Sequence, residues 1–293
     1  VCCQRCELVF LKERFLEEDV GSLYPEGYGP YNVKKESGLD SQDIGYYLRP
    51  DFLSSKVNEL FGSVLKKVRN SKLELKLEDI FSRPGEGKAL LDFGCGTDVF
   101  LNQARKNGWQ TTGMDFNEAS VSCVIASGHK GIHYDSEAAW SCIEDDSLDI
   151  IRLNHVIEHL YHPLDVITQL RKKLCKSGVL YMSTPNVDGV SAEKFKSFWW
   201  GLDCPRHIIL YSPDTIAKLI HAANFSAIDV YHEESSKDYL RSMAFQKLEG
   251  LNFNMKDLFN LDQNRKLVKH FFPRTKWAAM FGKGDRIHVF VSK

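Results

Sequence analysis

The stretch ALLDFGCGTDVFLNQARKNGWQTTGMDFN, residues 89–117, decides how this sequence folds. Its apolar beginning ends at Asp92, and two glycines follow at Gly94 and Gly96. A segment with helical character then leads into a second short strand that ends at another acid, Asp115. Strand, glycine turn, helix and strand in this order are typical of a loop that binds a nucleotide-containing cofactor.

The residues at the start of the helix narrow the choice of cofactor. In dinucleotide loops the pyrophosphate lies at the helix N-terminus, and a third glycine lets the helix pack closely. Here Val99 takes the place of that glycine, and Asp98 would put a negative charge beside the pyrophosphate. S-adenosylmethionine has no phosphate, so Asp98 would not repel it. The loop therefore favours S-adenosylmethionine over NAD or FAD.

Outward from this stretch, apolar strand-like runs alternate with helical segments. The expected strands are 88–93, 109–114, 130–134, 148–154, 178–183, 226–231 and 286–292. The expected helices include 99–107, 117–127, 163–174 and 213–223. This alternation predicts an α/β fold, with a doubly wound, mostly parallel sheet covered by helices on both faces. Ligands of such sheets bind beyond the carboxyl ends of the strands.

The segments on either side do not alternate between strand and helix, so we expect the chain to have three parts. Residues 1–48 form an irregular N-terminal arm, 49–233 the cofactor-binding core, and 234–293 a helical insertion with a closing C-terminal strand. An amphipathic pattern predicts a helix over 52–68, one face of which packs on the core. The segment 234–272 is polar and predicted to be helical.

Composition excludes several classes of protein. The 293 residues are 43% hydrophobic and 26% charged, which is ordinary for a globular protein. A net charge of -1 gives no reason to expect binding to nucleic acid or to an anionic membrane surface. No apolar run is long enough to span a bilayer, and no secretory signal opens the sequence. We therefore expect a cytoplasmic location.

Cysteines are clustered at the start of the sequence. Of eight in all, Cys3 and Cys6 have the spacing of zinc ligands. A structural zinc needs four ligands, and no second pair with this spacing occurs. Two interpretations stay open: half of a zinc ribbon whose other ligands lie upstream, or a few unliganded thiols. The sequence opens on Val1 and not on methionine, so we expect that residues precede it.

Four segments carry a family resemblance over about residues 85–232. They are LLDFGCGTDVFL, TTGMDFN, LDIIRLNHVIEHLYHPLDVITQLRKKLCKSGVLYMSTPN and FWWGLDCPRHIILYSPDTIAKLIHAANF. In order and spacing they resemble the class I S-adenosylmethionine-dependent methyltransferases, in the branch with EHL and PRH motifs. The CxxC followed by LYPEGYGPY resembles an arm often joined to this branch. The resemblance implies a seven-stranded Rossmann-like sheet whose C-terminal strand is antiparallel.

The resemblance also implies which residues bind the cofactor. The loop beneath the methionine part would comprise Asp92, Gly94, Cys95 and Gly96. Asp115 would accept hydrogen bonds from both ribose hydroxyls, a role suited to a carboxylate. Phe116 would lie near the adenine and Asp135 at its amino group, while Asn154 would lie beneath the methyl group.

The family usually has glycine where this sequence has Asp98. Its carboxylate could cap the following helix through a backbone N–H. It could instead meet the cofactor's ammonium or sulfonium charge. A third interpretation is that the loop has lost its ligand.

Catalysis of methyl transfer requires a positioned acceptor and, for many acceptors, a base. The base candidates are His155, His159 and His207, each of which could equally be a scaffold residue. Arg206 could hold an anionic part of the acceptor. Related quinone O-methyltransferases suggest a divalent metal in this region, for which Glu158 and His159 would supply two ligands.

The leading hypothesis is a methyltransferase acting on a small or glycan-linked acceptor, for example a nucleotide sugar or a surface-polysaccharide precursor. Relatives that carry the arm include sugar methyltransferases and many enzymes encoded with surface-polysaccharide genes. One alternative is an idle S-adenosylmethionine-binding or assembly module, and another is an NAD(P)-dependent oxidoreductase. The acceptor atom and the oligomeric state stay open.

Overall fold

The computed structural model describes residues 1–24, 72–81, 85, 87–247, 272 and 275–293. The helix predicted over 52–68 lies outside these residues, and so does most of the predicted insertion beyond Lys247. The division into parts at residues 48 and 233 therefore stays a prediction.

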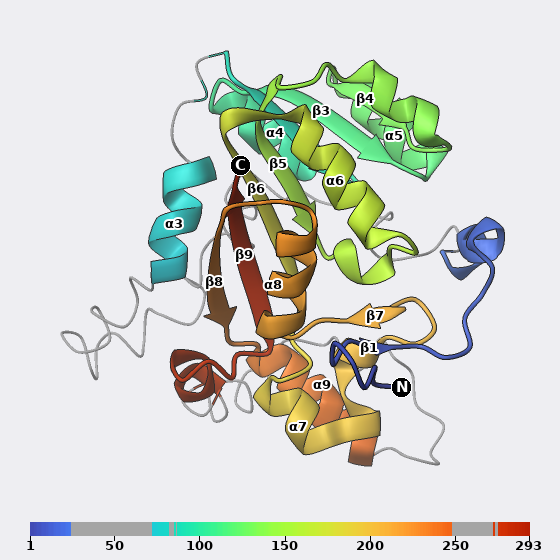
Figure 1. Cartoon of the computed structure of the whole chain (residues 1–293), viewed down its shortest axis with the longest axis vertical. Coiled ribbons are helices and arrows are strands. Elements are labelled where there is room, and N and C mark those ends of the chain that lie inside the picture. Colours follow the sequence, from blue (N-terminus) through green and yellow to red (C-terminus); the bar gives the residue numbers. More distant parts are fainter. Residues whose placement is uncertain (25–71, 82–84, 86, 248–271, 273–274) are drawn as a thin grey trace, which may run out of the picture.

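A seven-stranded sheet forms the centre of the molecule (Figure 1), in the order β4-β3-β2-β5-β6-β9-β8. The strands are β2 (Ala89–Phe93), β3 (Gln110–Asp115), β4 (Lys130–His133), β5 (Leu148–Asn154), β6 (Leu174–Pro185), β8 (Ala227–Glu233) and β9 (Arg286–Ser292). Strands β4, β3, β2, β5 and β6 are parallel, whereas β9 runs antiparallel to both β6 and β8. The predicted fold class is confirmed.

Alternation of side chains along β2 creates a core on each face of the sheet. Leu91 and Phe93 belong to the larger apolar cluster, which contains residues of α6 (Pro163–Lys173) and α8 (Pro213–Ala222). Leu90 points the other way, into the cluster with residues of α3 (Lys72–Phe81), α4 (Val99–Lys106) and α5 (Glu118–Ala126). Because side chains of a strand alternate between its two faces, one apolar run supplies both cores.

The remaining described elements lie outside the seven-stranded sheet. They are β1 (Val9–Phe10), η1 (Glu17–Leu23), η3 (Glu137–Cys142), η4 (Ile157–His159), α7 (Val190–Phe195), η5 (Lys196–Phe198), η6 (Trp200–Leu202), β7 (Ile209–Leu210) and α9 (Ser236–Lys247). Strand β1 pairs with β7, so the N-terminal arm is fixed to the segment that follows His207. Among the described helices, none is long and apolar enough to cross a membrane.

Candidate active site

A pocket of about 1700 Å³ opens where β2, β3 and β5 end. Its wall combines the glycine loop after β2, the residues after β5, the loop around His207 and the N-terminal 3-10 helix η1. This is the place at which doubly wound sheets bind ligands. The volume exceeds what a single small ligand fills and leaves room for a cofactor and an acceptor together.

The loop after β2 adopts a conformation that its glycines make possible. Gly94 and Gly96 have φ angles of +72° and +59°, in the left-handed region that favours glycine. A Cβ atom on Gly94 would lie 2.4 Å from Cγ2 of Val156. The backbone therefore approaches the chain after β5 closely and opens the floor of the pocket, where Cys95 also lies.

Asp115 stands at the end of β3 and binds the same loop. Its two carboxylate oxygens accept hydrogen bonds from the backbone N–H of Gly96, at 2.8 Å, and of Asn117, at 2.9 Å. Burial raises the pKa of Asp115, and these N–H donors partly oppose that effect. The carboxylate is thereby fixed at the pocket wall with lone pairs to spare, an arrangement that fits a ribose diol.

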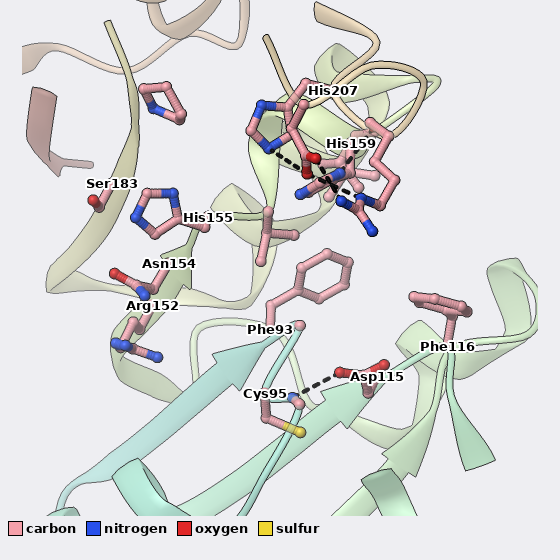
Figure 2. Close-up of a pocket in the computed structure, with 18 of the residues that line it drawn as sticks. Phe93, Cys95, Asp115, Phe116, Arg152, Asn154, His155, His159, Ser183 and His207 are labelled. Carbon is pink, nitrogen blue, oxygen red and sulfur yellow. Dashed lines mark hydrogen bonds and ion pairs between the residues drawn. The ribbon is translucent and has the colours of Figure 1, made fainter. Parts of the chain in front are cut away.

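Other predicted cofactor residues also line the pocket. Phe116 lies beside Asp115, with an exposed ring (Figure 2), and Asn154 ends β5 on the opposite side. Asp135 is exposed and accepts a hydrogen bond from the Ser136 hydroxyl at 3.0 Å. All three line the pocket, and their contact with the adenine and the methyl group stays a prediction.

Asp92, in contrast, is fully buried and does not line the pocket. Its Oδ1 accepts a 2.7 Å hydrogen bond from Nη1 of Arg152, which does line the pocket. Burial raises the pKa of Asp92, opposed by the charge of Arg152. Sequence reasoning missed Arg152, although a lone arginine inside the apolar run LDIIRLN was a visible signal.

Asp98 does not cap its helix through the backbone, so that interpretation was wrong. It precedes α4, but its side chain makes no cap hydrogen bond. Instead Oδ2 accepts hydrogen bonds from the Asn102 amide, at 2.8 Å, and the Ser127 hydroxyl, at 2.5 Å. The carboxylate therefore ties α4 to the end of α5 and does not line the pocket.

His155 has a strained backbone at the end of β5. Its φ angle is +56°, which is uncommon for a residue with a side chain, and its N–H donates to the Ser183 carbonyl at 2.9 Å. Its Nδ1 lies 3.2 Å from Oε1 of Glu158. The side chain is 34% exposed, so the ring remains accessible from the pocket.

Glu158 is a buried carboxylate near three histidines, of which Figure 2 shows His155, His159 and His207. Its Oε1 is 3.2 Å from Nδ1 of His155 and 3.9 Å from Nε2 of His207. Burial opposes its charge, but the hydrogen bond from His155 and the nearby His159 and His207 outweigh burial and lower the pKa of Glu158 to about 2. Glu158 is therefore ionised at neutral pH.

The other two histidines are oriented by backbone carbonyls. His159 Nδ1 lies 2.9 Å from the Arg206 carbonyl, and His207 Nδ1 lies 2.8 Å from the Gly201 carbonyl. A carbonyl can only accept, so these Nδ1 atoms carry the hydrogen and the Nε2 lone pairs remain available. The ring centroids are 4.7 Å apart. All three predicted base candidates thus gather around Glu158.

His159 should make the free energy of unfolding depend on pH. Burial lowers the pKa of His159 from 6.5 to about 4, with Glu158 opposing part of the shift. The unfolded chain then binds a proton that the folded chain rejects, so stability present above pH 6.5 is lost as the pH falls through 4. Urea unfolding of His159→Gln should show a shallower loss over this range than the native protein.

His162→Gln is the matched control, because that histidine is 67% exposed. Equal pH slopes for native protein and His159→Gln would contradict the assignment of His159 as a partly buried, neutral group.

Tyr24 brings the N-terminal arm into the site. Its hydroxyl lies 3.1 Å from Nδ1 of His159, and its ring packs edge-on against Phe116 with centroids 5.3 Å apart. The arm therefore contacts both the expected adenine end and the histidine cluster. Sequence reasoning missed this contact because the arm has no periodic pattern.

Two sets of residues fit a metal to different degrees. Glu158, His159 and His207 offer ligand atoms within 4.8 Å of one another, and a carboxylate with two imidazoles suits a divalent cation. Cys3 lies in a turn where the N–H groups of Cys6 and Arg5 lower the pKa of its thiol. Within the described residues no third ligand accompanies Cys3 and Cys6, so zinc there stays a prediction.

Comparisons with known proteins agree with this geometry. A family model described as "Methyltransferase domain" matches residues 65–230. The ubiquinone biosynthesis O-methyltransferase of Idiomarina loihiensis is 26% identical over 184 residues, 59% of this chain and 71% of that protein. Its counterpart in Pasteurella multocida is 28% identical over 116 residues, 34% of this chain and 47% of that protein. The chain thus spans about half the length of the second relative.

A solved structure supports the fold. The SAM-dependent methyltransferase from Archaeoglobus fulgidus covers 80% of this chain and 99% of its own, at 16% identity and a TM-score of 0.50. Since the family model matches more than half of the 293 residues, this chain belongs to the S-adenosylmethionine-dependent methyltransferases.

Proposed function

We propose that this enzyme methylates a hydroxyl group of a small acceptor, with His155 as the base. The observation that carries the proposal is the His155–Glu158 pair, in which a buried anion lies 3.2 Å from the Nδ1 atom of an accessible imidazole. Glu158 would hold Nδ1 protonated, leaving Nε2 to accept the acceptor's proton. Buried carboxylates orient and stabilise catalytic histidines in this way in other enzymes.

The reaction balances without another reactant. The acceptor oxygen forms a bond to the methyl carbon as the bond from that carbon to sulfur breaks, and S-adenosylhomocysteine leaves. The proton passes from the hydroxyl to His155 and then to water. A divalent cation on Glu158, His159 and His207 would add Lewis acidity toward the acceptor hydroxyl.

Charge in the pocket favours a neutral acceptor. Ten aspartates and glutamates line it against four arginines. All four arginines already bind carboxylates of the chain: Arg152 binds Asp92, Arg206 binds Asp203, and Arg241 and Arg286 bind Asp238. An anionic acceptor would therefore compete with internal partners. The paired carboxylates and guanidinium groups can donate and accept hydrogen bonds, which suits a ring that carries several hydroxyl groups. We therefore favour the sugar ring of a glycan precursor as the acceptor.

A catechol ring is the second candidate. The relatives named as ubiquinone biosynthesis O-methyltransferases support it. Isotope-labelled S-adenosylmethionine with the purified protein separates the two candidates. Label transfer to neutral glycosides and not to prenylated catechols would support the sugar, the reverse would support the catechol, and no turnover on either panel would contradict the proposed function.

Trp200→Ala should raise the acceptor KM about tenfold, because an indole ring contributes about 1 kcal/mol or more to contact with another ring. Trp200 lines the pocket near His207, and its backbone N–H donates to the Ser242 hydroxyl at 2.9 Å. The affinity for S-adenosylhomocysteine should stay unchanged. Trp277→Ala, at a side chain that is 60% exposed and outside the pocket, is the control. Equal KM values for native protein and Trp200→Ala would place the acceptor elsewhere.

A further inference from the structure

We propose that Arg152 binds the carboxylate of the cofactor's methionine part, and that Asp92 acts behind it as a positioning residue. The inference rests on S-adenosylmethionine as the cofactor and does not depend on the acceptor or on His155. It assigns to Asp92 an indirect role in place of direct contact with the ligand.

An arginine in the centre of the sheet requires a partner. Strand β5 lies between β2 and β6, and in the register Arg152 is opposite Asp92 on one side and Tyr181 on the other. The neighbouring residues of β5 are apolar and buried, so the guanidinium is largely removed from water. Burying a charge in such surroundings is costly unless an opposite charge accompanies it.

Asp92 supplies that charge but occupies only part of the guanidinium. Nη1 of Arg152 lies 2.7 Å from Asp92 Oδ1, and the guanidinium carbon lies 4.1 Å from the centre of the Phe100 ring. These two contacts fix the group's position and plane. No described residue accepts a hydrogen bond from its Nε or Nη2. The side chain remains 18% exposed and lines the pocket.

Two other arginines of the pocket donate to their carboxylates through more nitrogens than Arg152 does. Arg206 donates through two nitrogens to Asp203, and Arg286 donates through two nitrogens to Asp238. Arg241 also binds Asp238. Within the described residues no lysine lines the pocket. Arg152 lines the pocket, and its Nε and Nη2 donate to no described acceptor. It is therefore the arginine that we assign to an external anion.

Its location matches the expected end of the cofactor. Figure 2 shows Arg152 on the same side of the pocket as Asn154 and His155, across the Cys95 loop from Asp115 and Phe116. With the ribose on Asp115, an extended cofactor crosses the glycine loop and brings its amino acid part toward Arg152. Phe81, Phe100 and Tyr181 surround this end. Their apolar rings strengthen a charge-assisted hydrogen bond.

Calorimetry with two ligands tests the proposal. Titrations of the full chain would use S-adenosylhomocysteine and its analogue in which a neutral carboxamide replaces the carboxylate. A hydrogen bond between charged groups predicts that the native protein prefers the carboxylate ligand by about 10- to 100-fold. In Arg152→Gln this preference should fall to about threefold or less.

The control is Arg105→Gln, which removes an exposed arginine of α4 that donates to the Ser127 carbonyl. It should keep the native preference. If Arg152→Gln weakened both ligands equally, Arg152 would be structural and the proposal would be overturned. If Arg152→Gln unfolds because Asp92 is left unpaired, the double variant Asp92→Asn/Arg152→Gln removes both charges and takes its place. A double variant that still prefers the carboxylate ligand as strongly as the native protein would overturn the proposal. No acceptor is needed, so failure here is distinguishable from failure of the proposed function.

Discussion

Replacement of His155 by asparagine should lower kcat by about 100-fold or more, the usual range for loss of a general base. Asparagine is chosen because it tolerates the left-handed conformation that His155 adopts at φ +56°. It cannot accept a proton near neutral pH. Label transfer from S-adenosylmethionine measures the loss, and calorimetry with S-adenosylhomocysteine should give an affinity close to that of the native protein.

His162→Asn is the control for this variant, since that exposed histidine is seven positions further along the same segment. It should retain native turnover. Full activity of His155→Asn would remove His155 from catalysis and leave His207 and His159 as the candidates.

Gly94→Ala should abolish measurable cofactor binding and destabilise the protein by about 2–5 kcal/mol. The new Cβ atom would lie 2.4 Å from Val156 Cγ2, so the loop or the chain after β5 must move. Overpacking of this kind costs about 1–3 kcal/mol, and a left-handed φ adds about 1 kcal/mol or more. Both displaced segments form the pocket floor, so binding should suffer more than folding. Calorimetry and urea unfolding measure the two effects.

Gly87→Ala separates the two causes. Gly87 also has a positive φ, +86°, but a Cβ atom there would meet only the Gln110 side chain at 3.9 Å. It should show the conformational cost alone and retain cofactor affinity. Equal effects of the two variants would mean that the close approach to Val156 has no importance.

Much of the fold was predictable because local patterns and tertiary structure agree. Strand β2 was predicted over 88–93 and lies at Ala89–Phe93, since its apolar run has turn residues on both sides. Strand β6 is longer than the predicted 178–183 and begins at Leu174. Leu174 pairs with Leu148, and an irregularity between Leu148 and Ile150 accommodates the polar residues that follow Leu174. Only the partner strand determines that extension.

The site was predictable in its residue types but not in its pairings. His155 and Asp115 stand at strand ends, where the fold rule expects function. The pairing of Arg152 with Asp92 depends on the register of two strands 60 positions apart. The contact of Tyr24 with His159 spans 135 positions. No local period encodes such contacts. The interpretation of Asp98 as a helix cap was wrong for the same reason, because its partner Ser127 is 29 positions away in the sequence.

The pocket is complete only when β9, close to the C-terminal end of the described residues, is in place. Among the described strands β8 pairs only with β9, and about a hundred residues separate β9 from β6 in the sequence. Two pocket residues, Arg286 and His288, lie on β9 itself. A growing polypeptide therefore cannot complete this wall until residues 286–292 have been synthesised. Long-range closure of this kind is slow. Chains interrupted before β9 would expose the edge of β6 and lack a finished active site.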